Sequence, residues 1–70
     1  MTAKVANDWQ QRVRDEHREV SGRIERLEKF MQGESYKAVS ATESSRLRLQ
    51  LNLMRSYRNV LYERINHDFR

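Results

Sequence analysis

Apolar residues recur in the first half of the chain with the spacing of one helical face. They are separated by steps of three or four, and His17 occupies the one polar position of the series: Trp9, Val13, His17, Val20, Ile24, Leu27 and Met31. Such steps approach the heptad repeat by which one helix packs along another. Asn7 or Asp8 is suited to the N-cap, and Gly33 favours a left-handed C-cap. The pattern predicts a helix over residues 8–32.

A second helical pattern follows a short turn at residues 33–40, in which Tyr36 and Val39 have the spacing of one helical turn. Ser40 and Glu43 form a Ser-x-x-Glu capping box, in which two side chains satisfy two backbone N–H groups at a helix start. One face beyond it carries Leu47, Leu51, Met54, Arg58, Leu61 and Ile65. These signals predict a helix over residues 41–67. Because the connection is short, we expect one all-α domain over residues 1–70, folded as a two-helix antiparallel hairpin.

A second apolar stripe, made of Leu49, Leu53 and Val60, lies on the opposite side of the second helix. Counted at about 100° per residue from Leu47, these residues fall at roughly 200–240°, and Tyr57 at about 280° connects them to the seam. A two-helix hairpin buries one face of each helix, so this stripe stays in water unless another molecule covers it. The pattern predicts a homo-oligomeric helical bundle with Leu49, Leu53, Tyr57 and Val60 at its interface. Scattered surface leucines, which are common, are the alternative explanation.

Composition strengthens the case for self-association. The chain has 70 residues, of which 37% are hydrophobic, and it contains no cysteine. Domains below roughly 70–80 residues usually need disulfides, a metal or oligomerisation, and disulfides and thiolate metal sites are excluded here. His17 and His67 are too far apart in sequence for a local metal-ligand pair. We therefore expect no metal and no cofactor, and self-association as the source of extra stability.

The distribution of apolar residues also bears on location. No apolar run approaches the ~20 residues that span a bilayer, and the first residues lack the apolar segment of a secretory signal. We expect a cytoplasmic protein with no membrane partner.

Arginine is concentrated in the second helix. Residues 1–43 contain eight Lys or Arg and eight Asp or Glu, whereas residues 44–70 contain six Arg and two acidic residues. The net charge of +4 therefore belongs to the second part of the chain. Eleven of the fourteen basic residues are arginine, whose planar guanidinium pairs with phosphate oxygens and stacks on aromatic rings.

Three residues of this helix form a cationic stripe that ends in an aromatic ring. Arg48, Arg55 and Tyr62 are seven positions apart and share one side, with Arg58 beside them. In an antiparallel hairpin the start of the first helix lies beside the end of the second, so we expect Trp9 and Arg12 to approach Tyr62 and Ile65. Lys37 at the turn is a further outer candidate. The predicted ligand-binding residues are Arg48, Arg55, Arg58, Tyr62, Trp9, Arg12 and Lys37. Alternatively, Trp9 closes the open end of the hairpin and the arginines only keep the protein soluble.

Signals for catalysis are missing from the sequence. It has no phosphate-binding glycine loop, no nucleophile elbow and no His-Glu metal motif. We expect a binding protein and no enzyme.

Two stretches carry a resemblance to a known family. The second helix reads Gln50-Leu51-x-x-Met54-x-x-Tyr57-x-x-x-Leu61-x-x-Arg64-Ile65, and the first contains Trp9-Gln10-x-Arg12-Val13 and Ile24-x-x-Leu27-x-x-Phe30. Nearly the whole chain resembles a family of small bacteriophage proteins first named from crAss-like phage. Arg58 and Tyr62 depart from the smaller or polar residues typical of that family.

The hairpin also looks like the hairpin domain of phage counter-defence sponges, on the basis of size, architecture and arginine and tyrosine content. This resemblance implies an oligomer that sequesters a cyclic oligonucleotide or a cyclic ADP-ribose type signal made by a bacterial immune system. Two alternatives remain open. The second helix could bind nucleic acid, or the apolar stripe could bind a host protein.

Overall fold

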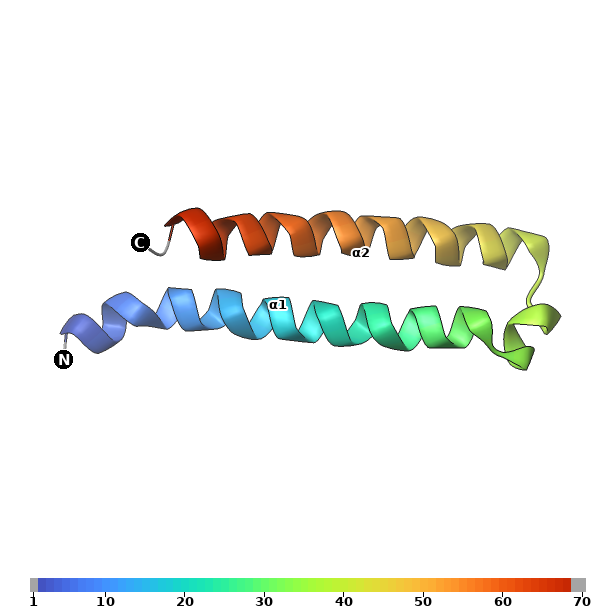
Figure 1. Ribbon diagram of the computed structural model, residues 1–70, viewed down its shortest axis with the longest axis horizontal. Helices are drawn as coiled ribbons and strands as arrows, with labels where there is room; N and C mark the ends of the chain where they lie inside the picture. Colours follow the sequence, from blue (N-terminus) through green and yellow to red (C-terminus); the bar gives the residue numbers. More distant parts are fainter. Residues whose placement is uncertain (1, 69–70) are drawn as a thin grey trace.

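The chain folds into two long antiparallel helices joined by a short 3₁₀ helix (Figure 1). The structure is a computed structural model that describes the backbone of residues 2–68 and the side chains of residues 8–67. Helix α1 spans Thr2–Gln32, the 3₁₀ helix η1 spans Glu34–Ala38, and helix α2 spans Ala41–Asp68. The described residues contain no strand, so the all-α hairpin is confirmed.

Helix α1 begins at Thr2, before the predicted start at residue 8. An N-cap at Asn7 or Asp8 is therefore wrong. The segment before Asp8 contains neither proline nor glycine, and it includes Ala3 and Ala6, the residue type with the highest helix propensity. Nothing in this segment stops the helix.

The predicted left-handed C-cap at Gly33 is also wrong. Gly33 has φ −91° and ψ 171°, an extended conformation that leads the chain into η1. Its N–H donates to the carbonyl of Phe30 at 3.1 Å, and its own carbonyl accepts from the N–H of Tyr36 at 3.3 Å. The rings of Phe30 and Tyr36 then meet edge to face, with centroids 5.9 Å apart. This 3₁₀ turn takes the place of a left-handed glycine in ending α1.

Helix α2 begins where its capping signal lies. The Oγ of Ser40 accepts the backbone N–H of Glu43 at 3.1 Å, which is the serine half of the predicted capping box. The carboxylate of Glu43 lies 3.8 Å from the guanidinium of Arg46. The N-cap role predicted for Ser40 is confirmed.

The core is a narrow seam between the two helices. Its buried residues are Val13, Val20, Ile24, Leu51 and Leu61, and Leu27, Met31, Met54 and Ile65 pack against them. All nine belong to the two faces predicted from the spacing. His17, Leu47 and Arg58 complete the seam as half-buried positions.

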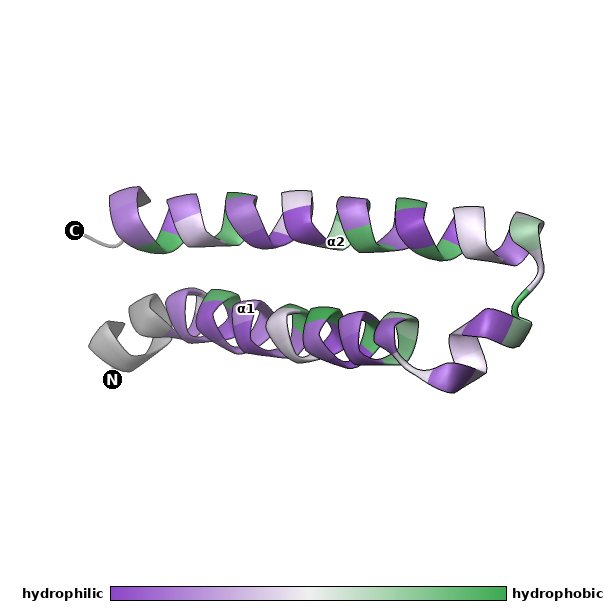
Figure 2. Cartoon of the chain, turned by 45° about the vertical axis from the view of Figure 1, so that its right-hand side comes forward, coloured by the Kyte–Doolittle hydropathy of each residue, from purple (hydrophilic) through white to green (hydrophobic). Residues whose placement is uncertain are grey.

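The molecule is elongated, with extents of 53 × 17 × 15 Å and a radius of gyration of 16.2 Å. A compact domain of this length has a radius of gyration of about 11 Å. Figure 2 shows apolar segments on α2 both toward α1 and on the side away from it. On that outer side Leu49, Leu53 and Val60 are 59%, 61% and 55% exposed. The hairpin therefore leaves the apolar stripe uncovered, as its helical position predicts.

Candidate ligand-binding site

The structure distributes the predicted ligand-binding residues over the two edges of the hairpin and its turn. Tyr57 and Tyr62 are five positions apart on α2 and point about 140° from each other. One edge, here called the arginine edge, carries Arg48, Arg55 and Tyr62. The opposite edge carries a hollow between the helices, here called the open-end groove, lined by Arg12, Val13, Glu16, Tyr57, Leu61 and Arg64.

On the arginine edge each side chain has a partner within the chain. Arg48 Nη2 donates to the Oγ of Ser44 at 3.2 Å. Arg55 Nη2 lies 2.6 Å from Glu28 Oε2, which joins α2 to α1. The ring of Tyr62, with 53% of its surface exposed, lies 6.4 Å from the ring of His17. On this edge Arg55 is therefore engaged in a contact between the two helices, and Arg48 in a contact within α2.

At the turn, a hydrogen-bonded group connects η1 with the start of α2. The hydroxyls of Tyr36 and Ser44 are hydrogen-bonded to each other. The hydrogen bond from Ser44, followed by one from Arg48, lowers the pKa of Tyr36 below its ordinary value. Arg48 is thus held by this group at the turn.

The open-end groove has a volume of about 200 Å³ and combines charge with aromatic surface. Arg12 and Glu16 line it from α1, and Tyr57 and Arg64 line it from α2. The guanidinium carbon of Arg64 lies 5.8 Å from the ring centroid of Trp9, within the range of a cation–π contact. Tyr57 is 45% exposed and Trp9 is 39% exposed. Two guanidinium groups and the ring of Tyr57 therefore line one groove, and the ring of Trp9 lies beside it against Arg64.

Of the two residues expected to approach Tyr62 and Ile65, Arg12 lies on the other edge from Tyr62, and Trp9 lies against Arg64 near the end of α2. Arg12 lines the open-end groove with Tyr57, while the ring of Tyr62 packs against His17 on the other edge. On each side of the hairpin, one edge of α1 lies beside one edge of α2. Because Tyr62 points about 140° away from Tyr57 around α2, it lies on the opposite side of the hairpin from the groove that Tyr57 lines.

The remaining two predicted residues lie elsewhere. Arg58 is half-buried in the seam, as its register predicts. Lys37 lies in η1 at the turn, where its ammonium group is 3.3 Å from the carboxylate of Glu34. The turn is at the other end of the molecule from the open-end groove (Figure 1). The seven predicted residues thus do not form a single site.

Sequence reasoning missed Arg64 and Glu16, and it assigned Tyr57 to the oligomer interface. A signal for the groove was present, because Gln50, Tyr57 and Arg64 are seven positions apart and share an edge of α2. This edge of α2 forms a groove only together with Arg12 and Glu16 of α1, and the spacing within α2 does not show that α1 lies there.

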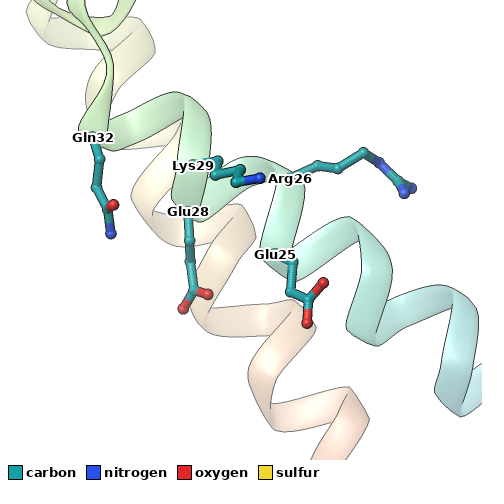
Figure 3. Close-up of a pocket in the computed structure, with 5 residues that line it drawn as sticks. All are labelled: Glu25, Arg26, Glu28, Lys29 and Gln32. Carbon is teal, nitrogen blue, oxygen red and sulfur yellow. The ribbon is translucent and has the colours of Figure 1, made fainter.

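A larger hollow of about 280 Å³ lies on α1 alone (Figure 3). It is lined by Glu25, Arg26, Glu28, Lys29 and Gln32. Its two carboxylates are matched by two cationic side chains, and no aromatic side chain lines it. This hollow is less suited to binding an anion than the open-end groove, in which Glu16 is the one acidic lining residue.

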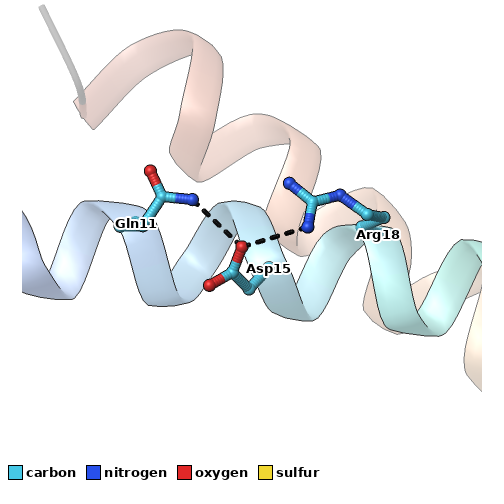
Figure 4. Close-up of polar contacts among 3 residues, drawn as sticks. All are labelled: Gln11, Asp15 and Arg18. Carbon is cyan, nitrogen blue, oxygen red and sulfur yellow. Dashed lines mark hydrogen bonds and ion pairs between the residues drawn. The ribbon is translucent and has the colours of Figure 1, made fainter.

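On the outer face of α1, the carboxylate of Asp15 contacts two neighbours of the same helix. Asp15 Oδ1 accepts from Gln11 Nε2 at 3.0 Å and lies 3.3 Å from Arg18 Nη1 (Figure 4). These are contacts between residues three or four apart, which contribute little to stability and form on most solvated helices. This face adds no candidate site.

The described residues offer neither a metal site nor a membrane-spanning helix. No three of their His, Cys, Asp or Glu side chains are placed so as to hold a metal ion. Within residues 2–68, neither α1 nor α2 is long and apolar enough to cross a membrane.

Comparison with known proteins places the chain in a family. A family model described as Sequestin matches residues 7–67, which include both edges of the hairpin and the turn. No curated protein and no solved structure matches the chain. Since the match covers most of its length, the chain belongs to the Sequestin family.

Proposed function

We propose that this protein sequesters an anionic nucleotide signal without transforming it. The ligand would be a cyclic oligonucleotide or a cyclic ADP-ribose type molecule of bacterial immunity. A phage-encoded protein of this kind would counter host defence in the cytoplasm of the infected cell. The family name supports sequestration, and the resemblance of the hairpin to phage sponges supports this ligand class.

The observation that carries the proposal is the composition of the open-end groove. Arg12 and Arg64 each supply a guanidinium group that can donate two hydrogen bonds to phosphate oxygens. Tyr57 supplies a face on which a nucleobase can stack, and Trp9, which lies against Arg64, adds aromatic surface beside the groove. The carboxylate of Glu16 is a hydrogen-bond acceptor for ribose hydroxyl or base N–H groups. Together these groups can contact the phosphate, the base and the ribose of a nucleotide.

The same groove favours binding over catalysis. Tyr57 is 45% exposed, and Arg12 and Arg64 are also exposed, so water reaches the ligand and the electrostatic interactions are screened. A group that stabilises a transition state acts best in a preorganised site from which water is excluded. An open cationic groove is suited to holding a charged molecule stoichiometrically.

One copy supplies only part of a ligand pocket. Sites that bury a small molecule occupy about 300–1,000 Å³, whereas the groove offers about 200 Å³. Tyr57 connects the groove to the apolar stripe of Leu49, Leu53 and Val60. A homo-oligomer formed through that stripe would place a second copy next to the groove and add to its walls.

Thermal-shift and calorimetric screening against cyclic dinucleotides, cyclic trinucleotides and cyclic ADP-ribose isomers tests the proposal. We expect one class to stabilise the protein, with a fixed ligand-to-chain ratio. Heat denaturation of the complex should then release that ligand chemically unchanged, as judged by chromatography. Absence of stabilisation by all three classes, or release of a modified product, would contradict sequestration.

A salt titration in the same assay separates a nucleotide ligand from nucleic acid. Binding of a short oligonucleotide duplex that falls steeply with salt, with no response to cyclic nucleotides, would favour nucleic-acid binding. The net charge of +4 on 70 residues is modest for that role.

The exposed apolar stripe favours a second candidate function, which is docking of a host protein. An amphipathic helix that presents apolar residues at these spacings fits a hydrophobic groove on a partner. A monomer in isolation that recovers one stoichiometric host protein, and binds no nucleotide, would support this candidate.

A further inference from the structure

The exposed side of α2 carries a heptad seam that extends beyond its three apolar residues. Residues at alternating steps of three and four share this side: Arg46, Leu49, Leu53, Ser56, Val60 and Glu63. All six are exposed in the hairpin. The spacing is that of a second coiled-coil face, directed away from α1.

We propose that a second copy of the chain covers this seam with its own α2 in antiparallel orientation, related by a two-fold axis between Met54 and Arg55. This arrangement rests on the homo-oligomer of the proposed function, and it specifies the surface of contact, the relative direction of the two helices and their register. A two-fold interface is self-complementary, so each contact occurs twice.

The order of charges along the seam supports the antiparallel direction. In the proposed register Arg46 of one copy shares a layer with Glu63 of the other, at both ends of the interface. A parallel arrangement would place Arg46 against Arg46 and Glu63 against Glu63. Like charges held close together disfavour an assembly, whereas the antiparallel pair places opposite charges together.

The apolar residues support the same register. Leu49 of one copy faces Val60 of the other, and Leu53 faces Ser56, so that all three residues of the apolar stripe lie within the interface. Moving one copy by a heptad in the direction that pairs Leu49 with Leu53 would place Val60 opposite Thr42 and Arg46 opposite Ser56. The proposed register uses both the apolar and the charged positions.

The hairpin is free to adopt this arrangement. The two charged residues contact partners within their own helix: Glu43 lies 3.8 Å from Arg46, and His67 lies 2.9 Å from Glu63. These exposed pairs contribute little, so exchanging them for contacts between copies costs little. Among the side chains of residues 8–67, five are buried in the core, and covering Leu49, Leu53 and Val60 would enlarge it without changing the fold.

Disulfide trapping tests both direction and register, because the natural chain contains no cysteine. A variant with Arg46→Cys is mixed with a size-tagged variant with Glu63→Cys under mild oxidation. We expect cross-links mainly between the two variants and few between identical chains. Cross-links mainly between identical chains would indicate a parallel dimer and overturn the proposal. A mixture of Arg46→Cys with Ser56→Cys is the register control, and preferential cross-linking of that pair would overturn the register.

Charge reversal gives an independent test by sedimentation equilibrium. Arg46→Glu should weaken the dimer by about tenfold, since two exposed ion pairs become repulsive. Adding Glu63→Arg in the same chain should restore wild-type association, because both pairs are re-formed with reversed sign. Failure of the second substitution to restore association would contradict the antiparallel pairing. Circular dichroism checks that each variant keeps its helix content.

Leu53→Glu should abolish the dimer, while Arg26→Glu on α1 serves as a charged control that leaves it intact. A wild-type chain that sediments as a monomer would overturn the proposal, including the case in which a host protein occupies the seam. If trapping and sedimentation support the dimer but no nucleotide binds, the proposed function fails and the dimer stands. If a nucleotide binds to a monomer, the reverse holds.

Discussion

Arg55 on α2 and Glu28 on α1 form an ion pair with 2.6 Å between Nη2 and Oε2, which ties the two helices together near the middle of the arginine edge. The pair is half-exposed, since 45% of the Arg55 side chain and 37% of the Glu28 side chain is accessible. Solvent screening therefore limits its contribution, but both partners are positioned by helices that already pack. Arg55 is thus assigned a structural role in addition to any contact with a ligand.

Replacing either partner should lower stability modestly. We expect Arg55→Gln and Glu28→Gln each to lower the free energy of unfolding by roughly 0.5–1 kcal/mol, measured by urea denaturation. In the double variant the losses should not add, because the second substitution removes no further interaction. Lys37→Gln is the matched control, since Lys37 and its partner Glu34 are 76% and 90% exposed. Full additivity of the two losses would show that the pair contributes nothing.

The middle of α1 contains a glycine that the packing does not require. A Cβ built on Gly22 would meet the end of the Arg26 side chain at 3.3 Å and, within 4 Å, no atom of α2. A long arginine side chain moves at little cost, and alanine is favoured over glycine inside a helix. We expect Gly22→Ala to raise the free energy of unfolding by about 0.5–1 kcal/mol. A loss of stability would instead indicate that the Arg26 side chain cannot move.

Leucines on the two sides of α2 should respond differently to truncation. Leu61 is 2% exposed in the seam and Leu53 is 61% exposed on the outer side. Leu61→Ala should lower the free energy of unfolding by about 2–5 kcal/mol because it leaves a cavity. Leu53→Ala should lower it by less than about 0.5 kcal/mol when the chain is dilute enough to be monomeric. Equal losses in the dilute chain would contradict the burial of Leu61 in the seam.

The turn should show a pH dependence that comes from Tyr36. Hydrogen bonds from Ser44 and then Arg48 lower the pKa of Tyr36 in the folded chain below its ordinary value near 10. A lowered pKa of an acidic group in the folded state favours folding at pH values above it. Relative to Tyr36→Phe, the wild-type free energy of unfolding should therefore rise as the pH increases through this pKa toward 10. The added stability should be absent at neutral pH.

The pKa itself is measured by following the ring carbon of Tyr36 by NMR during an alkaline titration. Arg48→Gln removes one of the hydrogen bonds and should move the midpoint of Tyr36 back toward its ordinary value. An unchanged midpoint would show that Arg48 does not act on the tyrosine.

How far the sequence predicts this molecule depends on whether a feature is local to one helix. Val20, Ile24, Leu51 and Leu61 lie in the seam because a helix with apolar residues at steps of three and four has only one way to bury them. The cap at Ser40 follows from its own segment in the same way. The two packing faces, the cap at Ser40 and the exposed stripe could therefore be predicted, whereas the start of α1 at Thr2 and the extended conformation of Gly33 were not.

The candidate site was harder to predict because it depends on two helices at once. The spacing shows that Arg48, Arg55 and Tyr62 share an edge, but not which edge of α1 lies beside it. That pairing depends on the rotation and offset of α1 against α2, which are set by η1 and by the extended conformation of Gly33. The antiparallel topology brings the start of α1 beside the end of α2, but it does not say which edge of α2 the start of α1 lies against. Trp9 and Arg12 were therefore matched with Tyr62, whereas Arg12 shares a groove with Tyr57 and Arg64, and Trp9 lies against Arg64.

The choice between the two edges can be made with matched arginine substitutions. If the open-end groove holds a nucleotide, Arg12→Gln and Arg64→Gln should each weaken its binding by about tenfold or more, since a hydrogen bond to a charged group contributes about 1.5–3 kcal/mol. Arg48→Gln removes the same charge on the arginine edge and should leave the dissociation constant within about twofold. Tyr57→Leu should also weaken binding, because it removes the stacking face while keeping apolar bulk. Calorimetry with the nucleotide identified by screening measures all four. A large effect of Arg48→Gln together with small effects of Arg12→Gln and Arg64→Gln would place the ligand on the arginine edge.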